Sequence, residues 1–215
     1  IYPVARRGSI TAKTSWNAGH AGQNQAPGSR EKLALVPAQT PNFEAYDFAN
    51  QVVANFVVDG DGQYIDERGS SRGISNQIDR QVLVHLRNRT RAVLVGGNTA
   101  RSESYRNDIR FDTYVLTNST AELTDGLISI TASNDQELSE LVKDICHQHE
   151  GLLVEAGPNL VSKLAALNAL DYLCLTIVDP REDPAILVRK LFNVSDPTLV
   201  NSQTIDNTLL TIWKL

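Results

Sequence analysis

Short continuous apolar runs recur along the chain from residue 51 onward, and they predict buried β-strands. Runs of this kind, rich in Val, Leu and Ile, are typical of parallel strands that are covered on both faces. They lie at 51–58, 92–97, 113–118, 126–131, 152–154 and 173–178. A last apolar run, within 202–215, is expected to close the sheet as an antiparallel strand.

Two segments between these runs have apolar residues at helical spacing. Between residues 75 and 88 they recur every three or four positions, and Ser75 is the predicted N-cap. Residues 134–150 have the pattern of an amphipathic helix capped by Asn134 or Asp135. The inward positions of this second helix are Leu138, Leu141, Val142 and Ile145. Strands that alternate with helices predict an α/β fold with a mainly parallel sheet.

The composition is ordinary for a globular protein and argues against two kinds of partner. Of the 215 residues, 41% are hydrophobic and 21% are charged. The formal net charge of -5 argues against nucleic acid as the main partner, because phosphate binding usually needs a basic face. No apolar run approaches the roughly 18 residues of a membrane span, so no membrane partner is expected.

The domain organisation follows from a change in composition near residue 45. Residues 1–45 are rich in Gly, Ala, Asn, Gln, Pro and Ser and predict a loop-rich N-terminal segment, whereas 46–215 is expected to form a single domain. Cys146 and Cys174 lack metal-ligand spacing. Cys174 lies inside an apolar run and is interpreted as a buried reduced thiol, which fits a cytoplasmic protein.

The stretch from residue 152 to 180 carries the strongest functional signal. Its first apolar run ends in Glu155, and a tight Ala-Gly-Pro-Asn turn, an amphipathic helix and a second apolar run follow. In a parallel sheet this is a βαβ unit, whose first turn exposes backbone N–H groups at a helix N-terminus and so offers an anion site. Glu155 lies at the carboxyl end of a strand, where α/β proteins place ligands. The combination points to a nucleotide-handling enzyme.

Two other strand ends carry candidate binding residues. Gly96 and Gly97 allow close approach of a ligand and Thr99 offers a hydroxyl, although a tight turn without a ligand is the alternative. Neither a G-x-G-x-x-G fingerprint nor a G-x-x-x-x-G-K-[ST] loop is present. Asp59 and Asp61 follow the first strand and are candidates to orient a substrate or transfer a proton, but Asp-Gly pairs also form turns.

Small polar side chains also end the third strand. Thr117, Asn118 and Ser119 are candidates to hydrogen-bond the 2′-phosphate of NADP, and a polar turn with a helix cap is the alternative. The "HQHE" run at 147–150 does not place its side chains to converge on one ion, so no metal site is expected there.

Taken in order, these segments resemble the pyrimidine reductase family of riboflavin biosynthesis, the C-terminal reductase domain of the bifunctional deaminase/reductase. The family's N-x-V-x-S-L-D-G strand is met by "NFVVDGDG" at Asn55, Asp61 and Gly62, while Asp59 and Gly60 replace the usual Ser and Leu. Its later motifs are met in order by "RGSSRGIS", "DRQVLVHLR", "AVLVGGNTARSESY" and "VEAGPNL". The resemblance covers about residues 50 to 180.

The resemblance implies a dihydrofolate-reductase-like fold of three layers, α/β/α, with a mainly parallel central sheet and an antiparallel C-terminal strand. It implies NADPH-dependent reduction of the ribosyl group of 5-amino-6-(5-phosphoribosylamino)uracil to a ribityl chain. Relatives of this kind commonly form homodimers, which is expected here too. The zinc deaminase signature, H-x-E followed by P-C-x-x-C, is missing from the sequence, so deamination is not expected.

The resemblance also implies roles for individual residues. Asp61 and Glu155 would be the catalytic acids beside substrate and nicotinamide, and Arg87 would bind the substrate phosphate. The substrate-binding set is Asn55, Asp59, Ser70, Arg87 and Glu103. The set that would bind NADPH is Gly96, Gly97, Thr99, Thr117, Asn118, Ser119, Gly157, Pro158, Asn159 and Leu160. The last four would cradle the cofactor pyrophosphate.

Two other functions stay open at this point. The departures from the family pattern at Asp59 and Gly60, with Ala156 in place of a glycine and Tyr172 in place of an acid, bear on the substrate. They favour a related NADPH-dependent reductase of a pterin-like or dihydrofolate-like substrate. A nucleotide-binding protein that retains the cofactor cleft without catalysis is the third possibility.

Overall fold

The computed structural model describes residues 40–103, 105–106, 108–119, 123–124 and 126–215. Most of the predicted loop-rich segment lies outside the described residues, so its boundary at residue 45 stays a prediction. A compact unit spans Ala38–Leu215, and all the described residues belong to it.

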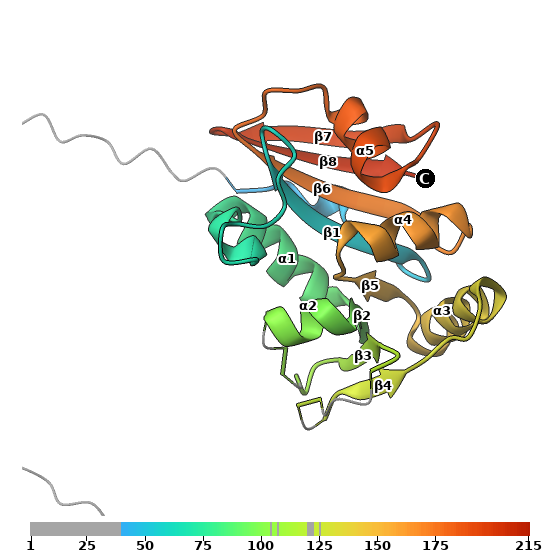
Figure 1. Cartoon of the computed structure of the whole chain (residues 1–215). Coiled ribbons are helices and arrows are strands. Elements are labelled where there is room, and N and C mark those ends of the chain that lie inside the picture. The colour runs from blue at the N-terminus through green and yellow to red at the C-terminus, as the bar shows by residue number, and fades with distance from the viewer. Residues whose placement is uncertain (1–39, 104, 107, 120–122, 125) are drawn as a thin grey trace, which may run out of the picture. The chain divides into compact units, whose positions relative to one another are not determined.

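An eight-stranded sheet forms the centre of this unit, with the strand order β4-β3-β2-β5-β1-β6-β8-β7 (Figure 1). The strands are β1 (Val52–Asp59), β2 (Ala92–Gly96), β3 (Asp112–Leu116), β4 (Ile128–Ile130), β5 (Leu152–Val154), β6 (Tyr172–Val178), β7 (Thr198–Ile205) and β8 (Thr208–Lys214). All pairs among β1 to β6 are parallel, whereas β8 is antiparallel to both β6 and β7. The predicted mainly parallel sheet with an antiparallel C-terminal strand is confirmed.

Helices cover both faces of the sheet, which confirms the predicted three layers (Figure 1). They are α1 (Gln77–Arg89), α2 (Gly97–Ser102), α3 (Asp135–His149), α4 (Pro158–Ala166) and α5 (Pro184–Phe192). Alternate residues of a strand point to opposite faces. In β1, Val53 packs with side chains of α1 and α2, whereas its neighbours Val52 and Ala54 pack with α3, α4 and α5. Both faces are therefore buried, as the continuous apolar runs predict.

The predicted N-cap of α1 differs from the one in the structure. Ser75 is not the N-cap of α1: the cap is Asn76, whose side chain accepts a hydrogen bond from the Asp79 amide. Ser75 instead donates its hydroxyl to the carboxylate of Asp79. The prediction was wrong because two adjacent residues are both good caps, and only the geometry decides which side chain reaches the free amide. Of the two caps predicted for α3, Asn134 and Asp135, the structure has Asn134.

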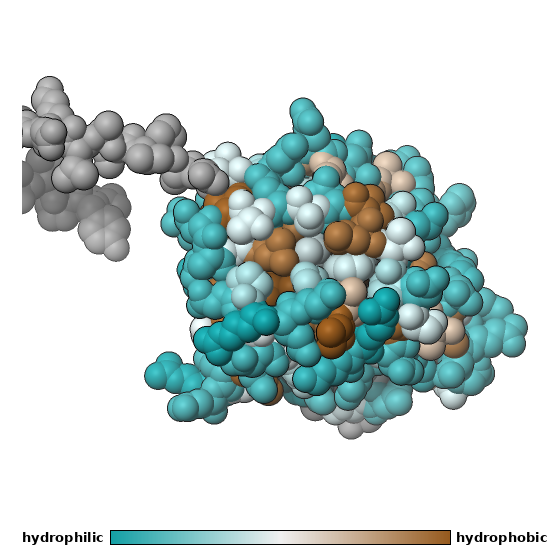
Figure 2. Space-filling view, turned by 90° about the horizontal axis from the view of Figure 1, so that it is seen from above, coloured by the Kyte–Doolittle hydropathy of each residue, from teal (hydrophilic) through white to brown (hydrophobic). Residues whose placement is uncertain are grey.

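The C-terminal region closes the sheet with a hairpin of β7 and β8 rather than with the single strand expected. β7 is the edge strand, and its residues Leu199 and Val200 are exposed. Figure 2 views the molecule from the side on which β7 lies in Figure 1 and shows apolar residues among hydrophilic ones. Within the described part of the chain, no helix is long and apolar enough to cross a membrane.

Candidate functional site

The carboxyl ends of the neighbouring strands β2, β5 and β1 meet at one edge of the sheet, and a large cavity opens there. Its volume is about 1020 Å³. Its walls come from the end of β1, the loop that precedes α1, one side of α1, the short helix α2 and the turn after β5. Ligands of open α/β sheets bind at this edge, so the cavity is the candidate active site.

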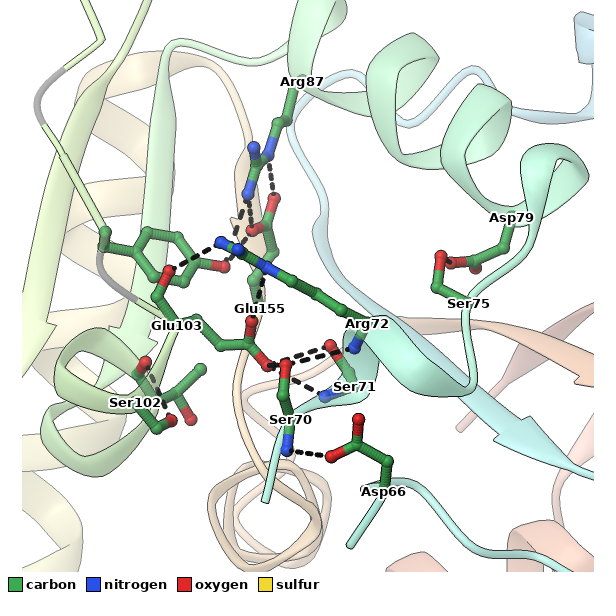
Figure 3. Close-up of polar contacts among 12 residues, drawn as sticks. Asp66, Ser70, Ser71, Arg72, Ser75, Asp79, Arg87, Ser102, Glu103 and Glu155 are labelled. Atoms are coloured by element: carbon green, nitrogen blue, oxygen red, sulfur yellow. Dashed lines mark hydrogen bonds and ion pairs between the residues drawn. The ribbon is translucent and has the colours of Figure 1, made fainter. Parts of the chain in front are cut away.

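Glu155 lies in this cavity, but its carboxylate is already fully engaged (Figure 3). Arg87 Nε donates to Glu155 Oε1 at 2.7 Å, and Arg87 Nη2 and the Tyr105 hydroxyl both donate to Oε2. Glu155 is buried and Tyr105 is partly buried. The hydrogen bonds that Arg87 donates to Glu155 raise the pKa of Arg87. Burial, followed by the charge of Glu155, raises the pKa of Tyr105. The cluster is therefore a neutral unit of one cation, one anion and one phenol.

This cluster changes what Arg87 is able to do. The structure brings together Glu155 and Arg87, the predicted catalytic acid and the predicted phosphate ligand, and it pairs them with each other. A guanidinium whose charge is matched by a buried carboxylate attracts a phosphate less than a free one does. Tyr105 was not predicted, because its partner Glu155 is 50 positions away and no local pattern links them.

Glu103 lines the cavity and accepts a hydrogen bond from Ser70, which holds the loop before α1 in place (Figure 3). Glu103 Oε1 accepts hydrogen bonds from the Ser70 hydroxyl at 3.0 Å, the Ser71 amide at 2.9 Å and the Ser71 hydroxyl at 3.1 Å. Arg72 Nε lies 3.3 Å from Oε2. The two predicted substrate residues thus hold the cavity wall in place.

Asp79 is the other buried acid that lines the cavity, and it was not predicted as a site residue. Its side chain is 3% exposed, and Ser75 Oγ donates to its Oδ2 at 2.6 Å. Burial is the largest cause that raises the pKa of Asp79. The sequence did hold a signal, because Asp79 lies three and seven positions before Val82 and Leu86, on the buried stripe of α1. A carboxylate on an apolar stripe is uncommon and warrants attention.

The structure does not bring Asp59 and Asp61 to the cavity wall. Asp59 Oδ1 accepts hydrogen bonds from the amides of Asp61 and Gln63, which makes it a turn former. The exposed Asp61 carboxylate pairs with Arg181 at 2.7 Å. At Gly60, an added Cβ would lie 1.9 Å from the carbonyl oxygen of Asp179, so only glycine fits. These departures from the family pattern therefore have a local structural cause.

The predicted cofactor residues fall into two groups. Thr99 and Gly157 line the cavity, and Gly157 is the N-cap of α4, with Pro158, Asn159 and Leu160 in the first turn. A Cβ added to Gly96 would lie 3.9 Å from Leu160, so the ends of β2 and α4 are neighbours. The second group, Thr117, Asn118 and Ser119, follows β3 and does not line this cavity.

Gly97 and Thr117 have a packing role. A Cβ added to Gly97 would lie 2.7 Å from Thr117 Oγ1, so this glycine lets α2 approach the end of β3. Thr117 is buried, and its Oγ1 accepts a hydrogen bond from the Ser119 amide. Gly157 is different, since an added Cβ there would have nothing within 4 Å. Its backbone faces open space in front of α4.

Two arginines at the cavity were not predicted as site residues. Arg80 on α1 and Arg106 after α2 are exposed and line the cavity. Among the described residues, neither guanidinium has a hydrogen-bond or ion-pair partner, in contrast to Arg72 and Arg87. They are the cavity's available cations. Sequence gave no reason to prefer them to other arginines, because availability depends on which acids the fold has already paired.

Comparison with known proteins agrees with this architecture. Residues 50–180 match the family described as the RibD C-terminal domain. A pyrimidine reductase-like protein from Corynebacterium diphtheriae is similar in structure, with a TM-score of 0.61, 19% sequence identity, and coverage of 76% of this chain and 91% of that one. No curated protein matches the chain in sequence.

Two further solved structures bear on the fold. The diaminohydroxyphosphoribosylaminopyrimidine deaminase/5-amino-6-(5-phosphoribosylamino)uracil reductase of Thermotoga maritima has a TM-score of 0.57 and 17% identity. The match covers 77% of this chain and 56% of that longer one. Dihydrofolate reductase of Enterococcus faecalis, complexed with NADP(H), has a TM-score of 0.54 and 16% identity, with coverage of 78% and 98%. These likenesses confirm the expected dihydrofolate-reductase-like fold, and the profile match over most of the chain shows that it belongs to the family of RibD C-terminal domains.

Proposed function

We propose that this chain is an NADPH-dependent reductase that converts the ribosyl group of 5-amino-6-(5-phosphoribosylamino)uracil to a ribityl chain. The observation that carries the proposal is the cavity of about 1020 Å³ at the carboxyl ends of β1, β2 and β5 in a member of this family. That volume lies at the upper end for small-molecule sites and accommodates a nicotinamide beside a phosphorylated sugar.

The residues at the end of β2 and the start of α4 fit a dinucleotide. A Cβ added to Gly157 would meet nothing within 4 Å, and one added to Gly96 would have its nearest neighbours, Leu160 and Thr99, at 3.9 Å. In the first turn of α4, Pro158 has no N–H and the Leu160 amide donates to the Gly157 carbonyl, so Asn159 offers the amide that, together with the helix dipole, would favour a diphosphate. Gly157, Pro158, Asn159 and Leu160 would hold that group, with Thr99 beside it. Bound there, NADPH would supply the hydride that reduces C1′ of the ribosylamine.

The substrate phosphate is assigned to Arg80 and Arg106. Both guanidiniums line the cavity, and neither forms an ion pair with an acid among the described residues, whereas Arg87 is neutralised by Glu155. Charge-assisted hydrogen bonds to phosphate are strong, so each arginine is expected to contribute roughly ten- to hundredfold to binding. Arg80→Ala and Arg106→Ala should each raise the KM for the phosphorylated substrate by that factor. Arg101→Ala is the control, because Arg101 is an exposed arginine on α2 that does not line the cavity.

The chain's own groups are expected to position the reactants more than to transfer protons. Holding donor and acceptor in line accounts for a large share of the rate in reactions of this type. The Arg87–Glu155–Tyr105 cluster would form a fixed wall at the point of reaction. We keep Asp61 as a proposed catalytic acid, which would assist opening of the sugar ring. Asp61→Asn with unchanged turnover and unchanged cofactor affinity would exclude it.

The edge strand β7 supports a second part of the proposal, the homodimer. Edge strands with exposed apolar side chains pair readily with another chain, and Leu199 and Val200 are such side chains. Sedimentation equilibrium should give twice the chain mass. Val200→Lys should shift the equilibrium toward the monomer, since a charge at an edge opposes pairing.

The test of the proposed reaction is NADPH oxidation on addition of 5-amino-6-(5-phosphoribosylamino)uracil, followed by loss of reduced-nicotinamide absorbance. Turnover with this substrate and none with dihydrofolate would support the proposal. The reverse result would favour the pterin-like alternative, for which the structural causes found for Asp59 and Gly60 weaken the case. NADPH binding without oxidation of either substrate would leave a non-catalytic nucleotide-binding protein.

A further inference from the structure

The loop at 66–73, before α1, has no apolar side chain that could anchor it to the core. Its sequence is Asp-Glu-Arg-Gly-Ser-Ser-Arg-Gly, and none of its residues is buried. Nevertheless Gly69, Ser71 and Arg72 line the candidate active-site cavity, so this loop forms part of its wall. Segments with few apolar contacts open at a low cost in free energy. The contacts that hold this loop therefore determine how readily the cavity opens.

Hydrogen bonds within the loop give it a defined shape of its own. Asp66 Oδ1 accepts hydrogen bonds from the amides of Arg68 at 2.9 Å and Ser70 at 3.0 Å. The Asp66 amide donates in turn to the Ser70 carbonyl oxygen. A Cβ added to Gly73 would lie 2.4 Å from Asp66 Oδ2, so the two ends of the loop are in close contact. A compact loop of this kind is able to move as one body.

A single residue connects this loop to the opposite side of the cavity (Figure 3). The amides of Ile74 and Ser75 donate to the Ser71 carbonyl oxygen, where the loop continues into α1. Every other hydrogen bond or ion pair between residues 66–73 and the rest of the described chain ends on Glu103. Glu103 is itself fixed, because it is the C-cap of α2 and its amide bonds back into that helix. It is therefore the polar anchor of the loop.

We propose that residues 66–73 form a lid on the cavity and that Glu103 is the positioning residue that latches it. In the latched state one carboxylate holds two serines and one arginine of the loop. Release of these contacts frees the lid as one body and opens the cavity to reactants and products. The inference rests on the proposed function, because the lid would regulate that same site. It assigns Glu103 a role other than the substrate contact that the resemblance implies.

The serine hydrogen bonds, more than the ion pair, carry the latch. The side chain of Arg72 is 72% exposed and that of Glu103 is 15% exposed, and such a pair contributes little. Hydrogen bonds to an ionised carboxylate are stronger than those between neutral groups. Ser70 donates one of them without lining the cavity, whereas Ser71 lines it. Substitution of Ser70 therefore weakens the latch and leaves the cavity surface unchanged.

Trypsin measures how often the lid opens, because Arg68 and Arg72 provide two cleavage sites within it. Cleavage requires local opening, and its rate follows the population of the open form when the loop recloses quickly. Mass spectrometry would quantify cleavage after each of these arginines in the protein without ligand. Cleavage after the exposed Arg181, which lies outside the lid, is the reference within the same molecule.

The variants test the latch from both of its sides. Glu103→Ala should raise the rate of cleavage in the lid at least about tenfold, and Ser70→Ala about threefold or more. Ser70→Thr keeps the hydroxyl on a backbone that is already extended, so it should be cleaved at the wild-type rate. The matched control is Asp108→Asn, which removes a cavity-lining acid that is paired with Arg110 instead. It should leave the rate unchanged, and circular dichroism would verify the fold of each variant.

The same assay with reactants separates this inference from the proposed function. NADPH with 5-amino-6-(5-phosphoribosylamino)uracil should slow cleavage of the wild-type lid at least about fivefold, because lid residues line the cavity. Oxidation of NADPH without this protection would overturn the lid. Equal cleavage of wild type and Glu103→Ala, or of Ser70→Thr and Ser70→Ala, would overturn the latch. Faster cleavage of Glu103→Ala in a protein that does not oxidise NADPH would support the latch and overturn the reductase.

Discussion

The buried ion pair between Arg87 and Glu155 provides the most direct test of the energetics at the cavity. Glu155→Gln keeps the shape of the side chain but leaves Arg87 opposite a neutral amide. The side chains of Arg87 and Glu155 are 28% and 6% exposed. Removal of one partner from such a pair leaves an uncompensated charge, which costs about 3–5 kcal/mol for a fully buried pair. Since Arg87 is partly exposed, we expect about 3 kcal/mol, or a fall in Tm of roughly 6–12 °C for a domain of this size.

A double-mutant cycle isolates the pair from the other contacts. Urea unfolding of wild type, Glu155→Gln, Arg87→Met and the double variant should give a coupling energy of about 2 kcal/mol, within the range for contacting residues. The matched control is the exposed pair of Arg181 and Asp61, whose side chains are 66% and 61% exposed. Its cycle, with Arg181→Met and Asp61→Asn, should give less than about 1 kcal/mol. A coupling below about 0.5 kcal/mol for Arg87 and Glu155 would refute the reasoning.

Two further predictions concern stability. Gly97→Ala places a Cβ 2.7 Å from Thr117 Oγ1 and should cost about 1–3 kcal/mol in urea unfolding, whereas Gly96→Ala, with no neighbour closer than 3.9 Å, should cost far less. Equal effects of the two substitutions would contradict the close packing of α2 on β3. Burial raises the pKa of Asp79 above 3.8, and the charge of Glu155 adds to this rise. The Ser75 and Thr176 hydroxyls and the charge of Arg80 act in the opposite direction. The folded state then holds this proton more tightly, so the stability it contributes is full below pH 3.8 and is lost as the pH rises through the folded-state pKa. Asp79→Asn should therefore be more stable than wild type at neutral pH, with a difference that shrinks in acid. A variant that is less stable at neutral pH would indicate a structural role for the carboxylate.

Most of the fold could be predicted from the sequence, because its strands are buried on both faces. Runs such as 92–97 and 152–154 have no polar face, and that pattern fits a parallel sheet covered by helices. The C-terminal hairpin was harder to predict. β7 carries mostly exposed residues, so it lacks the apolar run that marks the other long strands.

Only part of the site could be predicted from the sequence, because motifs identify residues but not the partners with which they pair. Glu155 and Arg87 were both recognised as site residues, yet their mutual pairing joins positions 68 apart. The same limit applies to Glu103, whose partners in the loop at 70–72 are about 30 positions earlier. Asp79 differs, because its place on the buried stripe of α1 made it detectable.

The central claim is that the amides at the start of α4 hold the diphosphate of NADPH, and one substitution tests it directly. Gly157→Asp has room for its side chain, provides a preferred N-cap, and places a negative charge where the diphosphate would bind. Thermal unfolding with and without NADPH is the measurement. We predict that NADPH raises the Tm of wild-type protein, and that Gly157→Asp has an equal or higher Tm without NADPH but loses most of the increase. An equal NADPH-induced increase in both proteins, or none in wild type, would contradict the claim.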